Sequence, residues 1–313
     1  MPCNDHPSDK ATYTFEITVP SGLTAVANGD LVDQTSSEGL TTYTWAEGRP
    51  MATYLIQLLT GDYSIVEGVG PNGLPLLSVV LTADEERMQV YLDGIAEQID
   101  FFDDLFGPYP LDRYGVAMTD SFGGLAMETL GRSLFSREDF LSGENGYIEQ
   151  LLLSHELGHQ WFGDAVTLAR WQDIWLNESF ATYAQWLWLD HVGLDTLDDQ
   201  ASQALIGRRG ERAAPPGDPE VGDLFGFNSY DGGATVLHAL RRTIGDDRFF
   251  DLLRAWVERF DGRSASTHDF IALAEEIAGQ DLSEFFDTWL YGPGDLVPPR
   301  YPARSASAMV SGR

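Results

Sequence analysis

The stretch SHELGHQWFGD, residues 154–164, points most directly to a fold and a chemistry. It contains His155 and His159, four residues apart, with Glu156 directly after the first histidine. Side chains four residues apart on a helix are neighbours, with Cβ atoms roughly 5–6 Å apart. Two imidazoles so placed can converge on one ion at Zn–N distances of about 2.0–2.1 Å. The H-E-x-x-H spacing is therefore typical of a metal site, although two hydrogen-bonded core histidines would share it.

The residues around this stretch predict a helix over residues 146–162. Ile148, Leu152, the two histidines and Phe162 recur at steps of four, three, four and three, which places them on one helical face. The histidines are thus expected to continue an apolar stripe that faces the interior. Such a stripe suits a metal site and a pair of core histidines equally well.

A second predicted helix begins with WLNESFATY, residues 175–183, and supplies a candidate third ligand. A catalytic zinc site needs three protein ligands and an open position for water. Glu178 lies at the start of this helix, where its carboxylate can turn toward the first helix. By itself, it could equally be an N-terminal charge that the helix dipole favours.

The combined pattern is H-E-x-x-H, then eighteen residues, then N-E, and it resembles the gluzincin metallopeptidases. It is most similar to the aminopeptidase N and leukotriene hydrolase family, whose usual flanks HELGHQWFGDAVT and WQDIWLNESFATY also match. One departure is Ser179, where that family usually has Gly. The resemblance implies one Zn²⁺ per chain, held by His155, His159 and Glu178.

A zinc ion held in this way would lower the pKa of a bound water toward ~7 and polarise the substrate carbonyl. The resemblance implies that Glu156 takes the proton of this water as a general base and passes it to the leaving amine. Asp164 and Asn177 are candidates for orienting the metal ligands, or for capping and turn residues.

A tetrahedral intermediate needs a hydrogen-bond donor for its oxyanion. The family uses a tyrosine just ahead of a helix, and FNSYDGGATVL places Tyr230 at the matching position. The family commonly has Lys two residues later, where this chain has Gly232. The resemblance implies a catalytic role for Tyr230, whereas alone it would be read as a packing or turn residue.

Recognition of a free α-amine in this family depends on a glutamate in a G-x-M-E-N stretch. FGGLAMETL places Ala126, Met127 and Glu128 on this motif, and a carboxylate can form a charge-assisted hydrogen bond with an ammonium group. Leu125 stands where Gly is usual, and Thr129 where Asn is usual. These changes leave open how strictly the site selects N-terminal residues.

Patterns along the rest of the chain predict an α+β fold. Residues 11–66 alternate as strands, and GVGPNGLPLL at 68–77 is a connector rich in glycine and proline. Then come a strand at LSVVL, one helix over residues 84–107, a strand at YGVAMTD and a mostly helical remainder. The resemblance assigns residues 1–66 to part of an N-terminal β-sheet domain. Residues 67–313 would form a thermolysin-like catalytic domain with a small mixed sheet and a mostly helical lobe.

Composition disfavours two classes of partner and predicts no membrane span or disulfide. The net charge of −30, with Lys10 as the only lysine, disfavours nucleic acids and anionic membranes. No apolar run approaches the ~18 residues of a spanning helix, so no membrane span is expected. Cys3 is the lone cysteine, so no internal disulfide is possible.

The ends of the chain carry a further expectation. PCNDHPSDKATYTF resembles an interior segment of the family, so part of the β domain is expected to precede it. FFDTWLYGPG resembles the close of the catalytic domain, without the helical C-terminal domain of longer members. The missing signal peptide therefore does not identify a compartment. A soluble cytoplasmic protein and a secreted one both agree with the sequence, which predicts no oligomeric state.

The leading hypothesis is a zinc aminopeptidase that acts on peptides with a free N-terminus. A zinc endopeptidase, or a hydrolase of another bond, is the alternative that Leu125 and Thr129 motivate. A truncated, non-catalytic remnant that acts by binding is the third hypothesis.

Overall fold

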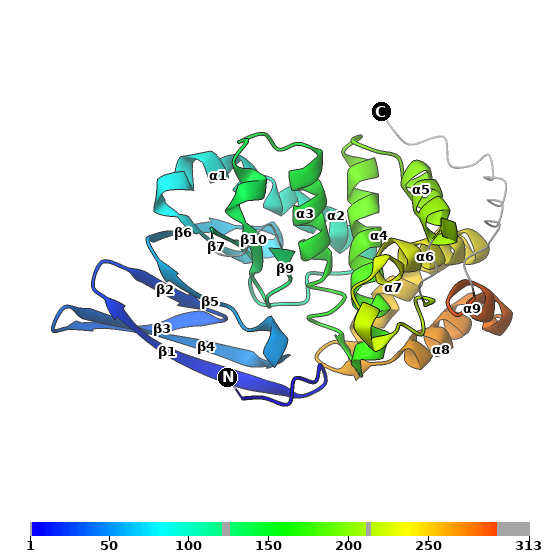
Figure 1. Ribbon diagram of the computed structural model, residues 1–313, viewed down its shortest axis with the longest axis horizontal. Coiled ribbons are helices and arrows are strands. Elements are labelled where there is room, and N and C mark those ends of the chain that lie inside the picture. The colour runs from blue at the N-terminus through cyan, green and yellow to red at the C-terminus, as the bar shows by residue number, and fades with distance from the viewer. Residues whose placement is uncertain (1, 121–125, 211–213, 293–313) are drawn as a thin grey trace.

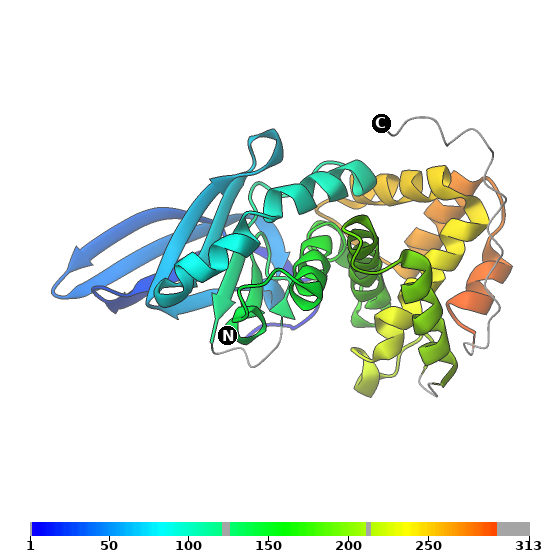
Figure 2. The same cartoon turned by 90° about the horizontal axis from the view of Figure 1, so that it is seen from above.

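Strands dominate the computed structural model up to Leu81, and helices dominate it from Glu85 onward (Figure 1). The structure describes residues 2–120, 126–210 and 214–292. Figure 2 shows strands β1–β5 at one end, helices α5–α9 at the other, and α3 and α4 between them. This arrangement confirms the predicted α+β class.

The N-terminal strands form two small antiparallel sheets. One has the order β1-β4-β3 and the other pairs β2 with β5. Their bounds are Lys10–Pro20 for β1, Thr24–Ala27 for β2, Asp30–Ser37 for β3, Leu40–Ala52 for β4 and Leu58–Gly61 for β5. Side chains of β4 alternate between buried and partly buried because successive residues point to opposite faces. The fully buried Trp45 donates its Nε1–H to the Ala25 carbonyl at 3.0 Å, which ties the two sheets together.

A five-stranded mixed sheet follows, with the order β6-β7-β8-β10-β9. Its strands are β6 (Tyr63–Val69), β7 (Pro75–Leu81), β8 (Val116–Thr119), β9 (Ala126–Met127) and β10 (Ser133–Ser136). The β7–β8 and β8–β10 pairs are parallel, and β9 is an antiparallel edge strand beside β10. The strands predicted at LSVVL and YGVAMTD are thereby confirmed as β7 and β8.

The run rich in glycine and proline at residues 68–77 covers the end of β6, the connection to β7 and the start of β7. These strands pair antiparallel from Tyr63↔Leu81 to Val69↔Pro75, and a 3-10 turn at Pro71–Gly73 joins them. The predicted boundary between residues 66 and 67 therefore falls inside β6. The division of the chain into two domains there stays a prediction.

The single helix predicted over residues 84–107 is wrong, because the structure has two helices there. Helix α1 spans Glu85–Leu92 and α2 spans Ile95–Phe106. The break falls at Asp93 and Gly94, and glycine in a helix interior costs about 1 kcal/mol relative to alanine. The end of α2 before Gly107 agrees with the sequence pattern, since Gly107 has a φ of +92°.

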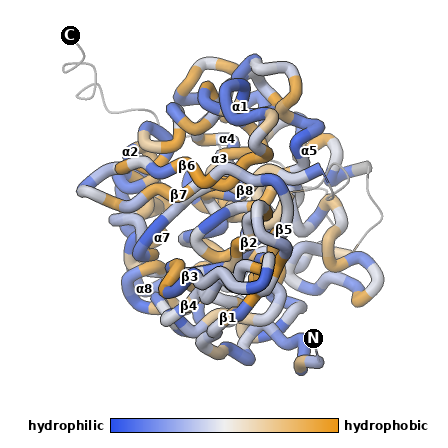
Figure 3. Tube along the Cα trace, turned by 90° about the vertical axis from the view of Figure 1, so that its left-hand side faces the viewer, coloured by the Kyte–Doolittle hydropathy of each residue, from blue (hydrophilic) through white to orange (hydrophobic). Residues whose placement is uncertain are grey.

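The C-terminal part of the described chain is mostly helical, as expected. Its helices are α3 (Tyr147–Gly158), α4 (Trp175–His191), α5 (Leu197–Gly210), α6 (Asp231–Ile244), α7 (Asp246–Phe260), α8 (Thr267–Ala278) and α9 (Ser283–Trp289). Apolar and polar stretches lie side by side along most of the trace (Figure 3). Every residue of α4 from Trp175 to Leu189 is buried, which marks it as the central helix. Among the described residues, no helix combines the length and apolar character needed to cross a membrane.

Helix α3 differs from its prediction in two ways. It ends at Gly158 rather than at residue 162, although His159 keeps a helical conformation and its N–H bonds the His155 carbonyl at 3.2 Å. The expected buried stripe is also wrong at Ile148, which is 54% exposed. The stripe fails because Ile148 lies in the first turn of α3, whereas burial is concentrated near the C-terminal end, where α3 packs on α4.

Close approach of α3 and α4 depends on Gly158. A Cβ atom at this position would lie 2.9 Å from the Ala184 Cβ and 3.4 Å from the Ala181 Cα. Glycine thus lets two helix backbones meet where a larger residue would separate them. The distance between the candidate site residues on α3 and those on α4 therefore depends on this contact.

We expect Gly158→Ala to destabilise the protein by roughly 1–3 kcal/mol, because the added methyl group overpacks the α3–α4 contact. Gly94→Ala is the matched control. Gly94 also has helical backbone angles, and the nearest atoms to an added Cβ lie 3.7 Å away. It should be neutral or up to about 1 kcal/mol more stable. Chemical denaturation measures both variants, and a Gly158→Ala protein as stable as Gly94→Ala would contradict the packing argument.

Candidate active site

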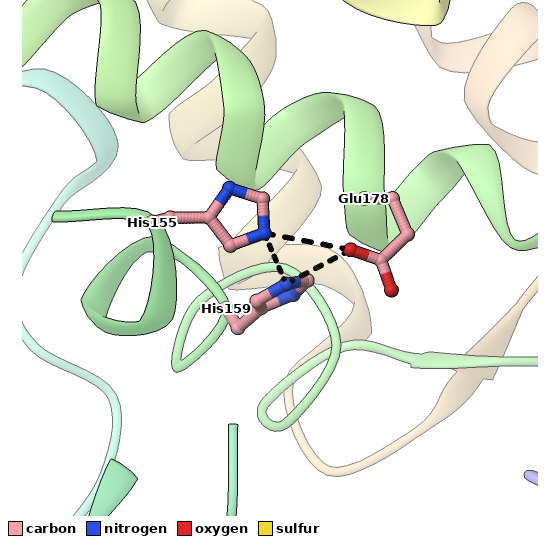
Figure 4. A group of neighbouring side chains, drawn as sticks. All are labelled: His155, His159 and Glu178. Carbon is pink, nitrogen blue, oxygen red and sulfur yellow. Dashed lines mark hydrogen bonds and ion pairs between the residues drawn. The ribbon is translucent and has the colours of Figure 1, made fainter. Parts of the chain in front are cut away.

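The structure brings the three candidate ligands together between α3 and α4 (Figure 4). The Nε2 atoms of His155 and His159 lie 3.1 Å apart. Oε2 of Glu178, in the first turn of α4, lies 3.5 Å from the first of these nitrogens and 3.2 Å from the second. Three potential donor atoms therefore form a nearly equilateral triangle.

The size of this triangle fits a tetrahedral zinc site. Ligand atoms about 2.0–2.1 Å from a tetrahedral zinc ion lie about 3.3–3.4 Å from one another. The observed separations of 3.1, 3.2 and 3.5 Å lie around this value. Two imidazole nitrogens and one carboxylate oxygen also form a donor set that zinc commonly takes.

Contacts at the far side of each ring orient the two histidines. His155 Nδ1 lies 3.2 Å from Oε1 of Gln185, and His159 Nδ1 lies 3.2 Å from the carbonyl oxygen of Phe162. Both oxygens can only accept, so each Nδ1 donates, and each ring in its neutral form has its lone pair on Nε2. Sequence reasoning missed Gln185, although it lies two helical turns after Glu178 on α4.

Charges around the triangle favour a cation. Burial disfavours ionisation of Glu178, but contacts with His159 and His155 outweigh this effect and lower its pKa to about 2. Burial also disfavours protonation of His159, yet Glu128 and Glu178 outweigh it and raise its pKa well above the usual value. The carboxylates that hold a proton on His159 would equally attract a divalent cation, which would displace that proton.

Glu156 lies on α3 between the two histidines and is 6% exposed. Its Oε2 has no hydrogen-bond partner among the described residues. Burial raises the pKa of this carboxyl group well above the usual value; His159 opposes the shift, and the carboxylates of Glu128 and Glu178 add to it. A carboxylate with a raised pKa, and with one oxygen free of hydrogen bonds to described residues, is suited to accept a proton.

Tyr230 lies between the short 3-10 turn Phe227–Ser229 and helix α6. Its ring stacks on His155, with centroids 6.0 Å apart and planes 19° from parallel. Burial raises the pKa of the Tyr230 phenol, and the carboxylates of Glu178 and Glu128 add to the shift. The phenol therefore stays protonated and can donate a hydrogen bond.

The structure accounts for two departures from the family pattern near Tyr230. A Cβ atom at Gly232 would lie 2.5 Å from Oδ1 of Asn228, so a side chain there would displace Asn228. Oγ of Ser179 donates to the Ser229 carbonyl at 2.7 Å and so ties α4 to the turn that precedes Tyr230. A Cβ atom at Gly233 would collide with the same hydroxyl, so Ser179 and Gly233 fit each other.

Two cavities meet at this site and share Ala126, His155, Glu156 and Tyr230. The first, of about 680 Å³, also contains Glu128. Its other walls are mostly apolar and include Tyr54, Met127, Trp171, Ile174, Leu224 and Phe225. The second, of about 640 Å³, has more polar walls that include Tyr147, Gln185, Asp195, Gln200, Gln203 and Asp231. The triangle thus lies where an apolar cavity opens into a polar one.

Glu128 follows the edge strand β9 and is 8% exposed. Its carboxylate, the Glu156 carboxylate and a ring nitrogen of His159 all lie within 4.8 Å of one another. Burial raises the pKa of Glu128, while His159 opposes the shift. The structure therefore brings Glu128 to the same site, in the wall of the apolar cavity.

The structure shows different contacts for Asn177 and Asp164, the two residues predicted to orient the metal ligands. Asn177 donates to the Tyr54 hydroxyl at 3.3 Å, rather than to a candidate ligand. The backbone N–H of Asp164 bonds the His159 carbonyl at 3.0 Å, but its carboxylate has no hydrogen-bond partner among the described residues. Their orienting roles stay predictions, and Leu125 lies outside the described residues.

Comparison with known proteins shows two domain matches. Residues 90–289 match the Peptidase family M1 domain, and residues 1–55 match the Peptidase M1 N-terminal domain. Among curated proteins, Aminopeptidase M1-C from Oryza sativa subsp. japonica is 29% identical over 316 residues, covering 92% of this chain and 35% of that protein. Glutamyl aminopeptidase from Sus scrofa is 29% identical over 309 residues, covering 92% and 33%. The chain thus spans about a third of the length of these relatives.

Solved structures extend the likeness to the fold. An M1 zinc metallopeptidase from Deinococcus radiodurans, solved as a variant bound to a Tyr-Ser-Ala substrate, matches with a TM-score of 0.85 at 32% identity. The match covers 96% of this chain and 68% of that one. With the domain match over residues 90–289, these findings establish that the chain belongs to peptidase family M1.

Proposed function

We propose that this chain is a zinc-dependent aminopeptidase, which releases N-terminal residues from peptides. The observation that carries the proposal is the triangle of His155, His159 and Glu178, with edges of 3.1–3.5 Å, beside the buried carboxylate of Glu156. Relatives named aminopeptidases and a similar zinc metallopeptidase with a bound tripeptide support it.

His155, His159 and Glu178 would hold the zinc ion. When bound, zinc supplies a Lewis acid that activates water and polarises a substrate carbonyl. Oε2 of Glu156 accepts a proton from the attacking water and delivers it to the amide nitrogen that leaves. Its freedom from hydrogen bonds to described residues leaves this oxygen available for both transfers.

Tyr230 and Glu128 bind different groups of the substrate. The protonated phenol of Tyr230 donates a hydrogen bond to the oxygen that gains negative charge. The Glu128 carboxylate binds the α-ammonium group of the substrate. The side chain of the N-terminal residue then lies in the apolar cavity, and the rest of the peptide extends into the polar one.

Glu178→Gln should weaken zinc binding by roughly 100-fold or more, because a neutral amide oxygen replaces a carboxylate ligand. Competition with a chromophoric chelator measures the affinity. Glu149→Gln is the matched control, since Glu149 is also buried but its carboxylate accepts from Ser142 at 2.7 Å, away from the triangle. Wild-type affinity in Glu178→Gln would remove this residue from the ligand set.

Glu156→Gln should keep about one zinc ion per chain and lose activity by about 100- to 10,000-fold, because the amide cannot accept the proton. Metal analysis and hydrolysis of aminoacyl-nitroanilides test both parts. A Glu156→Gln protein as active as the wild type would refute the assigned base. A folded, zinc-loaded wild type that hydrolyses none of these substrates would favour the non-catalytic remnant.

Peptides with a free N-terminus should be cleaved, whereas their N-acetylated counterparts should not, because acetylation removes the charge that Glu128 binds. A phenylalanyl peptide suits the comparison, since the cavity beside Glu128 has mostly apolar walls. Equal cleavage of the two peptides would exclude an aminopeptidase and favour the endopeptidase alternative.

A further inference from the structure

We propose that Gln57 and Thr129 are positioning residues for Glu128, so that the N-terminal strands control selectivity for a free amine. This inference rests on the proposed function of Glu128 as the amine-binding group. It concerns a buried hydrogen-bond network at the very position, Thr129, where the chain departs from the family pattern.

Glu128 lies in a tight turn between β9 and β10. The Thr129 N–H bonds the Met127 carbonyl at 2.9 Å, and the Arg132 N–H bonds the Thr129 carbonyl at 3.0 Å. Among the described residues, strand β9 pairs with β10 at Met127↔Leu134 and Ala126↔Phe135. The turn that follows Glu128 also fixes the backbone of this residue.

The side chain of Gln57, which comes from another part of the chain, stabilises this turn by hydrogen bonds. Its Nε2 group donates to Oγ1 of Thr129 at 2.8 Å and to the Arg132 carbonyl at 3.0 Å, and its Oε1 accepts from Arg132 Nη1 at 3.1 Å. The Thr129 hydroxyl donates in turn to the Arg132 carbonyl at 2.5 Å. Gln57, Thr129 and Arg132 are each 2% exposed, so water cannot replace a lost partner without rearrangement.

Arg132 fixes the orientation of the Gln57 amide. The guanidinium donates to the carbonyls of Leu77 and Ala27, both at 3.1 Å, and lies 5.6 Å from the Trp45 ring centroid. Because a guanidinium can only donate, the Gln57 oxygen must face it and the Gln57 NH₂ group must face Thr129. The network therefore has one arrangement rather than two.

Gln57 is itself anchored in the N-terminal strand region, just before β5. Its backbone N–H bonds Oδ1 of Asn28 at 2.6 Å. Asn28 Nδ2 donates to the carbonyls of Leu55 at 3.0 Å and Leu130 at 3.2 Å. The turn after Glu128 is thus fastened to the strand region at Thr129, Leu130 and Arg132.

His155 and Glu156 lie on α3, His159 directly follows it and Glu178 lies on α4. The mutual position of these helices follows from helix packing. Loss of the Gln57–Thr129 contact should therefore move Glu128 and leave the triangle in place. A displacement of a binding group by about 1 Å can weaken its contribution to binding or catalysis by about 100-fold. The expected result is a specific loss of amine recognition.

Two inhibitors that differ only in the α-amine test this inference on the zinc-loaded full chain. They are L-phenylalanine hydroxamic acid and 3-phenylpropanohydroxamic acid, and the readout is the ratio of their inhibition constants. Gln57→Leu and Thr129→Val should reduce the preference for the amine about 10- to 100-fold, with affinity for the amine-free inhibitor within about twofold of the wild type. Thr129→Ser should restore the wild-type ratio because it keeps the hydroxyl.

Gln98→Leu is the matched control, because Gln98 on α2 is also buried and donates to Gln150, in the first turn of α3, at 3.2 Å. It should keep the wild-type ratio. Unchanged ratios in Gln57→Leu and Thr129→Val, or parallel loss of both inhibitors, would overturn the inference. Thr129→Val, nearly isosteric, carries the test if Gln57→Leu does not fold. A wild type without preference for the amine would instead refute the proposed role of Glu128.

Discussion

The rest of the site depends on one constraint. Three side-chain atoms that carry lone pairs converge where α3 contacts α4. Two imidazole nitrogens and a carboxylate oxygen lie 3.1–3.5 Å apart in the interior, where uncompensated acceptors repel one another. Only a proton or a cation between them relieves this repulsion. Gly158 permits the close helix contact, and Gln185 and the Phe162 carbonyl turn the rings inward.

The parts of the site are held by different regions of the chain. The two helices fix the candidate ligands and Glu156, and Ser179 ties one of these helices to the turn before Tyr230. Glu128 belongs to a strand edge that Gln57 and Asn28 fasten from the N-terminal strands. The strand region and the helical lobe thus meet at the apolar cavity, where Tyr54 and Trp171 also pack edge to face, with ring centroids 5.2 Å apart.

Local periodicity predicted the α+β class and the pairing of His155 with His159, because these signals act over one or two helical turns. The roles of Glu178, Tyr230 and Glu128 were predicted only through the resemblance to a known family, since these residues lie far from the histidine pair in the sequence. The sequence pattern does not predict the break between α1 and α2 at Gly94. Apolar residues keep their helical spacing on both sides of Gly94, and a single glycine ends a helix only weakly. The exposure of Ile148 depends on which neighbours cover α3, and one sequence pattern does not specify them. Gln57 could not be found, because its partner Thr129 is 72 residues away.

The central claim is that His155, His159 and Glu178 hold one zinc ion. The most direct measurement is an anomalous-difference map from crystals of the zinc-loaded chain, recorded on both sides of the zinc absorption edge. The account predicts a single peak about 2.0–2.1 Å from the two Nε2 atoms and close to the Glu178 carboxylate. A peak elsewhere, or none between these three side chains in a crystal that contains zinc, would contradict it.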